Sequence, residues 1–318
     1  MRLLTAGSRI LFSRFWQVVA NAVAVLLIAK TLGPERQGWF SLTVAVAMLL
    51  GAALGGGMGL AAVPPLRNRR VPIARMLTAQ MLWAAGMGLI LGVLAWLAGG
   101  AQASRFLADH LGWSPSMAWL AAGAGLGLLT FDIFAYDLLA RGRLIVGAAV
   151  NGYRASLYLV LVAVLTLLDQ LTLGRAIGVF ALTQGVGAVA MFVILVREIR
   201  NPRFGREPGP GDALSEASGP LPLPPGRGEG LRAEGRSIPG LISFNLQRGW
   251  IGQISAVAYF LLLRLDQGLL EHFRGAAEVG IYSLAVYAGE ILWLLPGALT
   301  PILVHTSATG GDDSDRDL

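Results

Sequence analysis

The chain has 318 residues, of which 55% are hydrophobic and 14% are charged, with a formal net charge of +6 and no cysteine. This composition provides too little polar surface for a soluble globular protein of this length, so it predicts an integral membrane protein. The absence of cysteine excludes disulfides, zinc–thiolate sites and thiol nucleophiles.

Apolar stretches follow one another along most of the chain. A membrane-spanning helix needs about 20 mostly apolar residues. About eight stretches qualify, near residues 10–29, 40–63, 77–98, 116–138, 144–168, 174–196, 243–263 and 279–304. The predicted fold class is therefore all-α and integral to the membrane, with a six-helix N-terminal transmembrane bundle over residues 1–200.

The composition changes after this bundle. Residues 201–240 are rich in proline, glycine and charge, so they cannot bury enough apolar surface to fold. They are predicted to form a flexible cytoplasmic linker. Residues 241–307 hold the last two spans, the opening hairpin of a second bundle, and residues 308–318 form a polar tail.

The last two spans repeat the first two. At one constant offset, the matched residues are Arg14, Trp16 and Asn21–Ala24 with Arg248, Trp250 and Ser255–Ala258. After an insertion in the second copy, the matches resume as Gly38 and Phe40–Leu42 with Gly280 and Tyr282–Leu284. Such self-similarity predicts two homologous, parallel bundles with the substrate handled where they meet. If six helices complete the first bundle, the second is represented only by its first hairpin, so we expect a truncated chain.

Arginines alternate between the two sides of the predicted bundle. Every second junction is rich in arginine, beginning with Arg2 and Arg9, whereas the junctions between them carry few basic residues. The positive-inside rule therefore places the amino terminus in the cytoplasm and, after about eight crossings, the carboxyl terminus there too. This distribution argues against nucleic acid as a partner.

Each copy of the repeat opens with a helix that carries a polar stripe. The stripe of the first span consists of Arg14, Gln17 and Asn21, and the stripe of the seventh span includes Arg248, Ser255 and Tyr259. Such groups are expected to face the bundle interior or a wet cavity, because lipid offers them no partners. The planar guanidinium suits phosphate oxygens, and two arginines from two related bundles could clamp a diphosphate. Two alternatives stay open: both arginines extend to lipid headgroups as positive-inside anchors, and the other four residues only form interhelical hydrogen bonds.

Acidic residues within the spans are candidates for ion coupling. Asp132 in the fourth span and Glu290 in the eighth could each exchange a proton or hold a cation. For Glu290 a buried structural role is an equal alternative. Asp137 precedes Arg141 by four residues, so we expect a helical ion pair near the cytoplasmic edge.

Residue patterns typical of enzymes are scarce in the sequence, and a membrane enzyme, the remaining alternative, lacks a candidate active site. The three histidines, His110, His272 and His305, lie at or beyond the ends of spans, and no two of them have metal-ligand spacing. Neither a phosphate loop nor a nucleophile elbow stands out. We therefore predict a protein that is not an enzyme, with no metal site and no cofactor, apart from coupling to a proton or Na⁺.

Two regions resemble a known family. Leu27–Leu42 and Gly57–Ala62 are similar to the first helical hairpin of bacterial oligosaccharide flippases. These flippases are the O-antigen and exopolysaccharide exporters of the multidrug/oligosaccharidyl-lipid/polysaccharide exporter superfamily. A second set of segments is similar to the family's seventh and eighth helices: Arg264–Asp266, Val279–Ala285, Glu290 and Leu295–Pro301. The resemblance covers the whole chain except the linker, although the chain stops short of the family's usual number of spans.

The resemblance implies two bundles that alternate between inward-open and outward-open states around a central cavity. It implies that undecaprenyl-diphosphate-linked oligosaccharide crosses the bacterial cytoplasmic (inner) membrane, with Arg14 and Arg248 on the diphosphate. Membrane lipids, a polysaccharide polymerase and glycosyltransferases are the partners implied. The alternatives are a cation-coupled multidrug antiporter of the same superfamily, for which Asp132 or Glu290 would couple the ion, and a non-transporting fragment.

Overall fold

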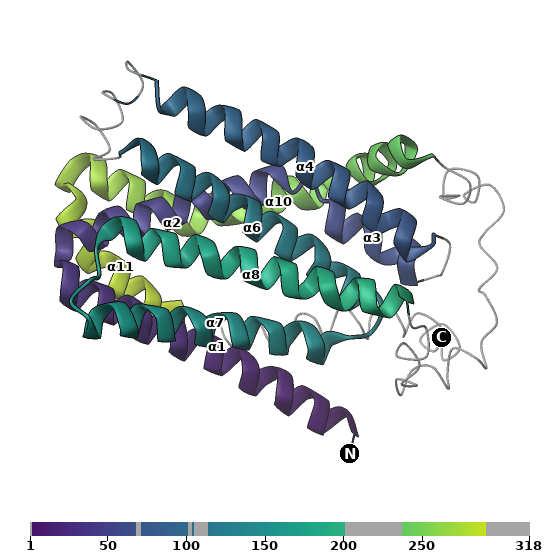
Figure 1. The fold of residues 1–318 in the computed structure, drawn as a ribbon, viewed down its shortest axis with the longest axis horizontal. Helices are drawn as coiled ribbons and strands as arrows, with labels where there is room; N and C mark the ends of the chain where they lie inside the picture. The colour runs from purple at the N-terminus through teal and green to yellow at the C-terminus, as the bar shows by residue number, and fades with distance from the viewer. Residues whose placement is uncertain (1, 68–70, 101–103, 105–113, 201–236, 291–318) are drawn as a thin grey trace, which may run out of the picture.

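The computed structural model describes residues 2–67, 71–100, 104, 114–200 and 237–290. These residues form long helices that run side by side (Figure 1). The helices are α1 (Arg2–Leu32), α2 (Pro34–Leu54), α3 (Met58–Arg67), α4 (Ile73–Ala98), α6 (Pro115–Ala140), α7 (Leu144–Leu167), α8 (Leu173–Arg200), α10 (Ile238–Arg274) and α11 (Ala276–Glu290). The predicted all-α class is confirmed.

Six of the described helices are long and apolar enough to cross a membrane: α1, α2, α4, α6, α7 and α8. They correspond to the six spans predicted for residues 1–200. Helices α10 and α11 lie at the predicted seventh and eighth spans, but neither is among these six helices. Helix α10 runs from Ile238 to Arg274 and extends beyond both ends of the span predicted near residues 243–263. Most of the predicted linker, the end of the eighth span and the polar tail lie outside the described residues.

The second predicted span, near residues 40–63, is two helices rather than one. Helix α2 ends at Leu54 and α3 begins at Met58, because Gly56 and Gly57 have φ values of +59° and +66°. This left-handed region favours glycine. Helix α10 passes the break so closely that the backbones of Gly57 and Gly249 touch. The backbone N–H of Gly57 donates to Gln253 Oε1 at 2.6 Å, so α10 supplies an acceptor at the break.

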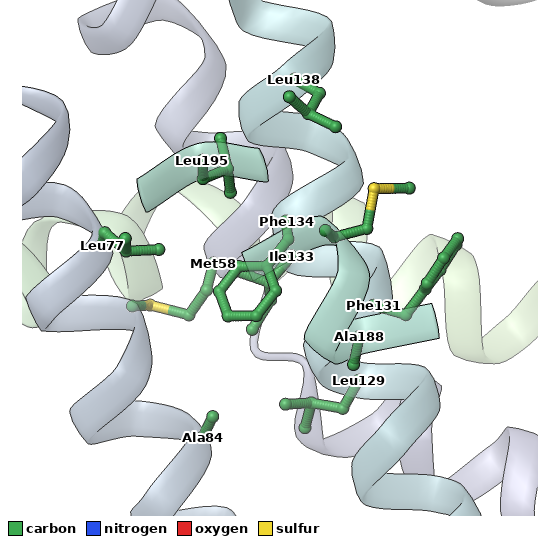
Figure 2. Packing of buried hydrophobic residues seen from close by; sticks show 11 residues of the cluster. Met58, Leu77, Ala84, Leu129, Phe131, Ile133, Phe134, Leu138, Ala188 and Leu195 are labelled. Carbon is green, nitrogen blue, oxygen red and sulfur yellow. The ribbon is translucent and has the colours of Figure 1, made fainter. Parts of the chain in front are cut away.

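Helix α6 lies at the centre of the first bundle, where it contacts α2, α3, α4, α7 and α8. Its aromatic and aliphatic side chains pack with residues from α3, α4 and α8 (Figure 2). The buried members of this cluster are Met58, Leu77, Ala84, Leu129, Phe131, Ile133, Phe134, Leu138, Ala188, Met191 and Leu195. Glycine allows close approach to α2, since a Cβ on Gly125 would lie 3.1 Å from the carbonyl oxygen of Ala47. Polar residues on α6 are therefore held in place by helices on several sides.

The turn between α1 and α2 has the same geometry as the turn between α10 and α11. Gly33 has a φ of +80° and Gly275 a φ of +84°. Each glycine N–H donates to the carbonyl oxygen four residues earlier, on Ala29 at 3.0 Å and on Glu271 at 2.8 Å. The offset between these turns equals that of the second half of the predicted repeat. The structure thus supports the repeat and places the predicted insertion inside α10, which has 37 residues against 31 in α1.

Helices α2 and α11 cross at a pair of equivalent glycines. A Cβ on Gly38 would lie 2.7 Å from the carbonyl carbon of Ala276, and a Cβ on Gly280 would lie 2.8 Å from the carbonyl carbon of Pro34. Pro34 and Ala276 are also equivalent in the repeat, so each copy presents the same surface to the other. The contact is therefore close to two-fold symmetric, as in an isologous dimer interface.

Buried polar groups lie beside this crossing. Gln37 Nε2 donates to Ser41 Oγ at 3.3 Å and to Ser283 Oγ at 3.5 Å. All three side chains are buried, and the two serines are again equivalent in the repeat. The α2–α11 contact thus joins the first bundle to the second copy through backbone packing and neutral hydrogen bonds.

One end of the bundle is richer in arginine than the other. The amino terminus lies at the same end as the α6–α7 turn and the end of α8 (Figure 1). Arg67 closes α3 at this end, and Arg197 and Arg200 close α8. The helix order therefore agrees with the alternation of arginine-rich junctions predicted from the sequence.

Candidate functional site

The polar stripe of α1 lies along the first bundle. Arg14, Gln17 and Asn21 are all half-buried. Arg14 Nη1 donates to Gln17 Oε1 at 3.4 Å, whereas the buried Nε of Arg14 has no hydrogen-bond partner. One donor of this guanidinium is therefore unused.

Helix α7 fixes the rotation of α1 about its axis. Ser13 Oγ donates to the carbonyl oxygen of Ala148 at 2.6 Å, and Trp16 Nε1 donates to Ser156 Oγ at 2.7 Å. These bonds lie on the helix face next to Arg14. Because they hold that face against α7, they also fix the direction of the polar stripe.

The charged neighbours of Arg14 come from α6 and α7. Asp132 on α6 and Arg154 on α7 both interact electrostatically with Arg14, and we call these three residues the inner charged cluster. Asp132 is solvent-exposed within the described structure, although α6 is surrounded by other helices. The described ion pairs do not include Asp132, which faces the two arginines at longer range. Two guanidinium groups against one carboxylate leave the cluster with a net positive charge.

Arg154 is a site residue that the sequence analysis missed. Its guanidinium donates to Gln184 Oε1 and, at 2.8 Å, to Asn151 Oδ1, and it lies 4.9 Å from the centre of the Phe131 ring. Its Nε is buried without a partner. An arginine inside a span is costly and is usually functional, so its position within residues 144–168 was the signal that could have identified it.

The polar stripe of α10 is more exposed than that of α1. Arg248 lies over the Phe244 ring, 4.8 Å from its centre. Among the described residues, Ser255 Oγ donates to the carbonyl oxygen of Ile251 in its own helix, at 3.0 Å, and Tyr259 is 50% exposed. The stripe occupies a different face of α10 from the one that contacts the α2–α3 break. It is therefore free to meet groups other than the first bundle.

Arg14 and Arg248 are not brought into contact within the described residues. Arg14 faces α6 and α7, whereas Arg248 lies on the exposed side of α10. A diphosphate clamp between them stays a prediction. The arginine that shares the Asp132 carboxylate with Arg14 is Arg154.

Glu290, the other predicted coupling residue, is the last residue of α11, and its side chain lies outside the described set. Its role stays a prediction. In the part of the chain that the structure describes, no group of three or more histidine, cysteine, aspartate and glutamate residues could hold a metal ion.

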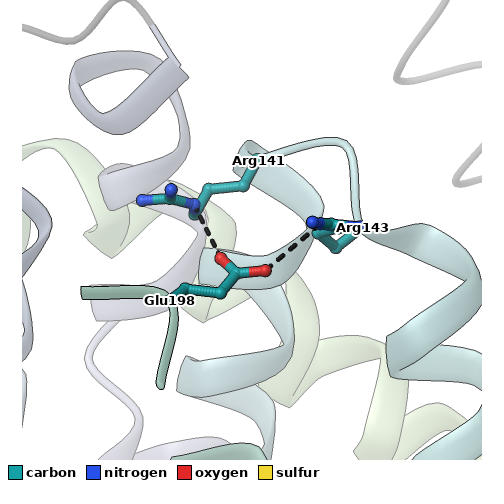
Figure 3. Close-up of polar contacts among 3 residues, drawn as sticks. All are labelled: Arg141, Arg143 and Glu198. Carbon is teal, nitrogen blue, oxygen red and sulfur yellow. Dashed lines mark ion pairs between the residues drawn. The ribbon is translucent and has the colours of Figure 1, made fainter. Parts of the chain in front are cut away.

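The predicted ion pair between Asp137 and Arg141 is wrong. Arg141 Nε lies 2.9 Å from one oxygen of Glu198, and Arg143 Nε lies 3.2 Å from the other (Figure 3). Asp137 is fully buried and accepts a hydrogen bond from Gln80 Nε2 at 2.9 Å. Spacing along α6 suggested the pair, but the tertiary fold supplies a nearly buried carboxylate from α8 that binds both arginines. This network joins the α6–α7 turn to the end of α8.

Comparison with known proteins identifies the fold. No protein-family model matches the chain, and no curated protein matches it. The structure is similar to that of the MATE multidrug transporter DinF-BH, with a TM-score of 0.53 and 16% sequence identity over 95% of this chain. The match covers 64% of the transporter, so the chain spans less than two thirds of its length. The protein is therefore a multi-pass, all-helical membrane protein with a MATE-like transporter fold.

Proposed function

We propose that this protein takes part in moving undecaprenyl-diphosphate-linked oligosaccharide across the bacterial cytoplasmic membrane, for the synthesis of O-antigen, capsule or exopolysaccharide. The amino terminus lies in the cytoplasm, and the two copies of the repeat alternate in access to the two sides. A transporter fold and arginine-rich cytoplasmic junctions support this proposal. The polysaccharide polymerase and glycosyltransferases of the same pathway are its expected partners.

The observation that carries the proposal is the inner charged cluster. Arg14 and Arg154 each keep a buried Nε without a partner, and Asp132 beside them is exposed. Arginine forms paired, charge-assisted hydrogen bonds with phosphate oxygens. A diphosphate that reaches Asp132 would therefore meet two guanidinium groups with unused donors, and the net positive charge of the cluster favours an anion.

Arg248 would complete the diphosphate site from the second copy. It occupies the repeat position of Arg14, and its side chain is exposed. Gln17 and Asn21 on α1, with Ser255 and Tyr259 on α10, would then offer hydrogen bonds to the first sugars. This part of the proposal depends on the two stripes facing one substrate path.

A cation-coupled multidrug antiporter is the second candidate. The similarity to a multidrug transporter and the exposed carboxylate of Asp132 favour it. In this case Asp132, with Glu290, would bind the coupling cation, and the neighbouring arginines would tune its affinity. The two candidates differ in the group on which transport depends: arginines for the lipid diphosphate, carboxylates for drug exchange.

Binding of undecaprenyl diphosphate to the purified chain in lipid nanodiscs tests the first candidate. Arg14→Gln, Arg154→Gln and Arg248→Gln should each weaken binding by about tenfold, because each removes a charged hydrogen-bond donor. Arg197→Gln is the matched control, since Arg197 is an exposed arginine at the end of α8. Undecaprenol, which lacks the phosphates, should bind poorly to every variant.

Two results would contradict the proposal. The first is equal affinity for undecaprenol and undecaprenyl diphosphate. The second is unchanged diphosphate binding in all three arginine variants. Loss of polysaccharide export in cells carrying the same variants, with normal membrane insertion, would connect binding to transport. Drug efflux that is lost in Asp132→Asn while polysaccharide export persists would favour the antiporter instead.

A further inference from the structure

Three buried polar residues lie on the helix segments that pack together where α10 approaches α4 and α6. Asp137 on α6, Gln80 on α4 and Asn245 on α10 are all fully buried. Asp137 and Gln80 are joined directly by a hydrogen bond of 2.9 Å. Asn245 Nδ2 donates to Met76 Sδ at 3.3 Å. Because Met76 lies one turn before Gln80 on α4, the amide of Asn245 reaches the same face of that helix.

Apolar packing brings these helix segments together. A buried cluster joins Met76 and Ala79 of α4, Ala140 of α6, and Leu241 and Phe244 of α10. These residues are close in sequence to the three polar residues on each helix. The polar group is therefore enclosed by apolar side chains rather than open to the lipid.

The three polar side chains have more acceptors than donors. Asp137 Oδ2, Gln80 Oε1 and Asn245 Oδ1 are buried, and none of them has a hydrogen-bond donor. The orientation of the Gln80 amide follows from chemistry, since the reverse orientation would set its oxygen against a carboxylate oxygen. Buried acceptors without partners are rare in native proteins and call for an explanation.

The charge of Asp137 is also incompletely balanced. Arg141 is the charged group that faces it, but the guanidinium of Arg141 is bound to Glu198. A buried carboxylate with a single neutral hydrogen bond is costly, and such groups are normally paired or bound to a cation. A cation bound beside the joined Asp137 and Gln80 side chains would balance this charge and provide a partner for their unpaired oxygens, and Asn245 on the adjacent segment of α10 would offer a further oxygen.

We propose that Asp137, Gln80 and Asn245 form a binding site for a monovalent cation, with Na⁺ as the expected ion. Carboxylate and amide oxygens are ligands for hard cations. A single carboxylate balances one positive charge, whereas calcium sites commonly draw on several carboxylates. The site involves both copies of the repeat, because α4 and α6 belong to the first bundle and α10 opens the second. An occupied site therefore holds α10 against the first bundle, and an empty site weakens that contact.

Direct binding of radiolabelled sodium to the full chain in lipid nanodiscs tests the site. Choline chloride replaces sodium chloride at constant ionic strength and constant pH. Wild type should bind sodium saturably, Asp137→Asn should abolish binding, and Gln80→Leu and Asn245→Leu should each raise the dissociation constant by about tenfold or more. Gln37→Leu is the matched control, because Gln37 is an equally buried amide at the α2–α11 crossing, and it should bind sodium as wild type does.

Thermal unfolding in the same nanodiscs provides a second readout. Sodium should raise the unfolding temperature of wild type, because a ligand that binds only the folded state stabilises it. Asp137→Asn should unfold at a temperature independent of sodium, since its amide supplies a donor to the unpaired oxygens and removes the charge. This expected stability keeps the variant informative.

Several results would overturn the cation site. They are absence of sodium binding in wild type, unchanged binding in Asp137→Asn, and loss of binding in Asp132→Asn with Asp137 intact. Stabilisation of wild type by lowered pH without any response to sodium would assign the site to a proton rather than a metal cation. None of these outcomes depends on undecaprenyl diphosphate, so failure of this site and failure of the proposed function are distinguishable.

Discussion

Substitution of Gly38 by alanine should destabilise the protein by forcing α2 and α11 apart. The new Cβ would meet the backbone of Ala276 and would also lie 3.1 Å from the backbone nitrogen of Gly280. Since these neighbours are backbone atoms, no flexible side chain can move aside. Overpacking costs about 1–3 kcal/mol, and we expect about 3 kcal/mol here. Alanine favours the helix over glycine by up to about 1 kcal/mol, which leaves a net loss of about 2 kcal/mol.

Unfolding in mixed micelles titrated with sodium dodecyl sulfate measures this loss. Gly86→Ala in α4 is the control, because a Cβ there would meet nothing within 4 Å, so only the helix preference remains. Gly280→Ala should resemble Gly38→Ala, since the contact is nearly symmetric. The double variant should cost less than the sum of the single changes, because one separation of the helices relieves both clashes. Equal stability of Gly38→Ala and Gly86→Ala would refute the backbone contact.

Two further changes test contacts that the sequence did not suggest. Glu198→Gln removes the carboxylate shared by Arg141 and Arg143. The free energy of unfolding in the same titration should therefore fall by about 2–3 kcal/mol. A stability equal to that of wild type would mean that these ion pairs do not contribute to stability. Gln253→Leu leaves the half-buried N–H of Gly57 without its acceptor and should lower the free energy of unfolding by about 1–2 kcal/mol. Gln253→Glu keeps an acceptor and should recover most of that loss. Equal free energies of unfolding for Gln253→Leu and Gln253→Glu would exclude this hydrogen bond.

The helical class was predictable because it depends on features that the sequence states directly. Apolar length marks the spans, and the repeat is recorded as matched residues at constant offsets. The repeat even extends to a turn that the matched residues did not include, through Gly33 and Gly275, which share one backbone conformation. Apolar spans and turn glycines are preserved when a helical hairpin is duplicated, so they can be recognised in the sequence without knowledge of the fold.

The α2–α3 break was not predicted because an apolar stretch containing several glycines is compatible with two structures. Gly55–Gly57 could equally allow close packing within one helix or interrupt it. The acceptor that stabilises the interrupted form is Gln253, which is distant in sequence. Only the approach of α10 makes the break favourable, and sequence spacing contains no information about that approach.

Partners of buried charges were the least predictable part of the site. Arg14 was recognised because Arg248 occupies the equivalent position in the second copy of the repeat. Arg154 has no equivalent residue in the second copy within the described residues, and it was missed. Asp137 was assigned to Arg141 by helical spacing, but the arginine binds Glu198 from another helix. Pairing across helices is decided by tertiary packing, which spacing along one helix does not report.

Two of the contacts between the copies differ in what can break them. The α2–α11 crossing combines backbone packing at Gly38 and Gly280 with neutral hydrogen bonds, so its strength should not depend on ions. The buried Asp137 carboxylate of α6 lies beside the contact of α10 with α4, and under the proposed cation site the strength of that contact would depend on the bound ion. Release of the proposed cation would therefore weaken the α10 contact first, while the glycine crossing stays closed.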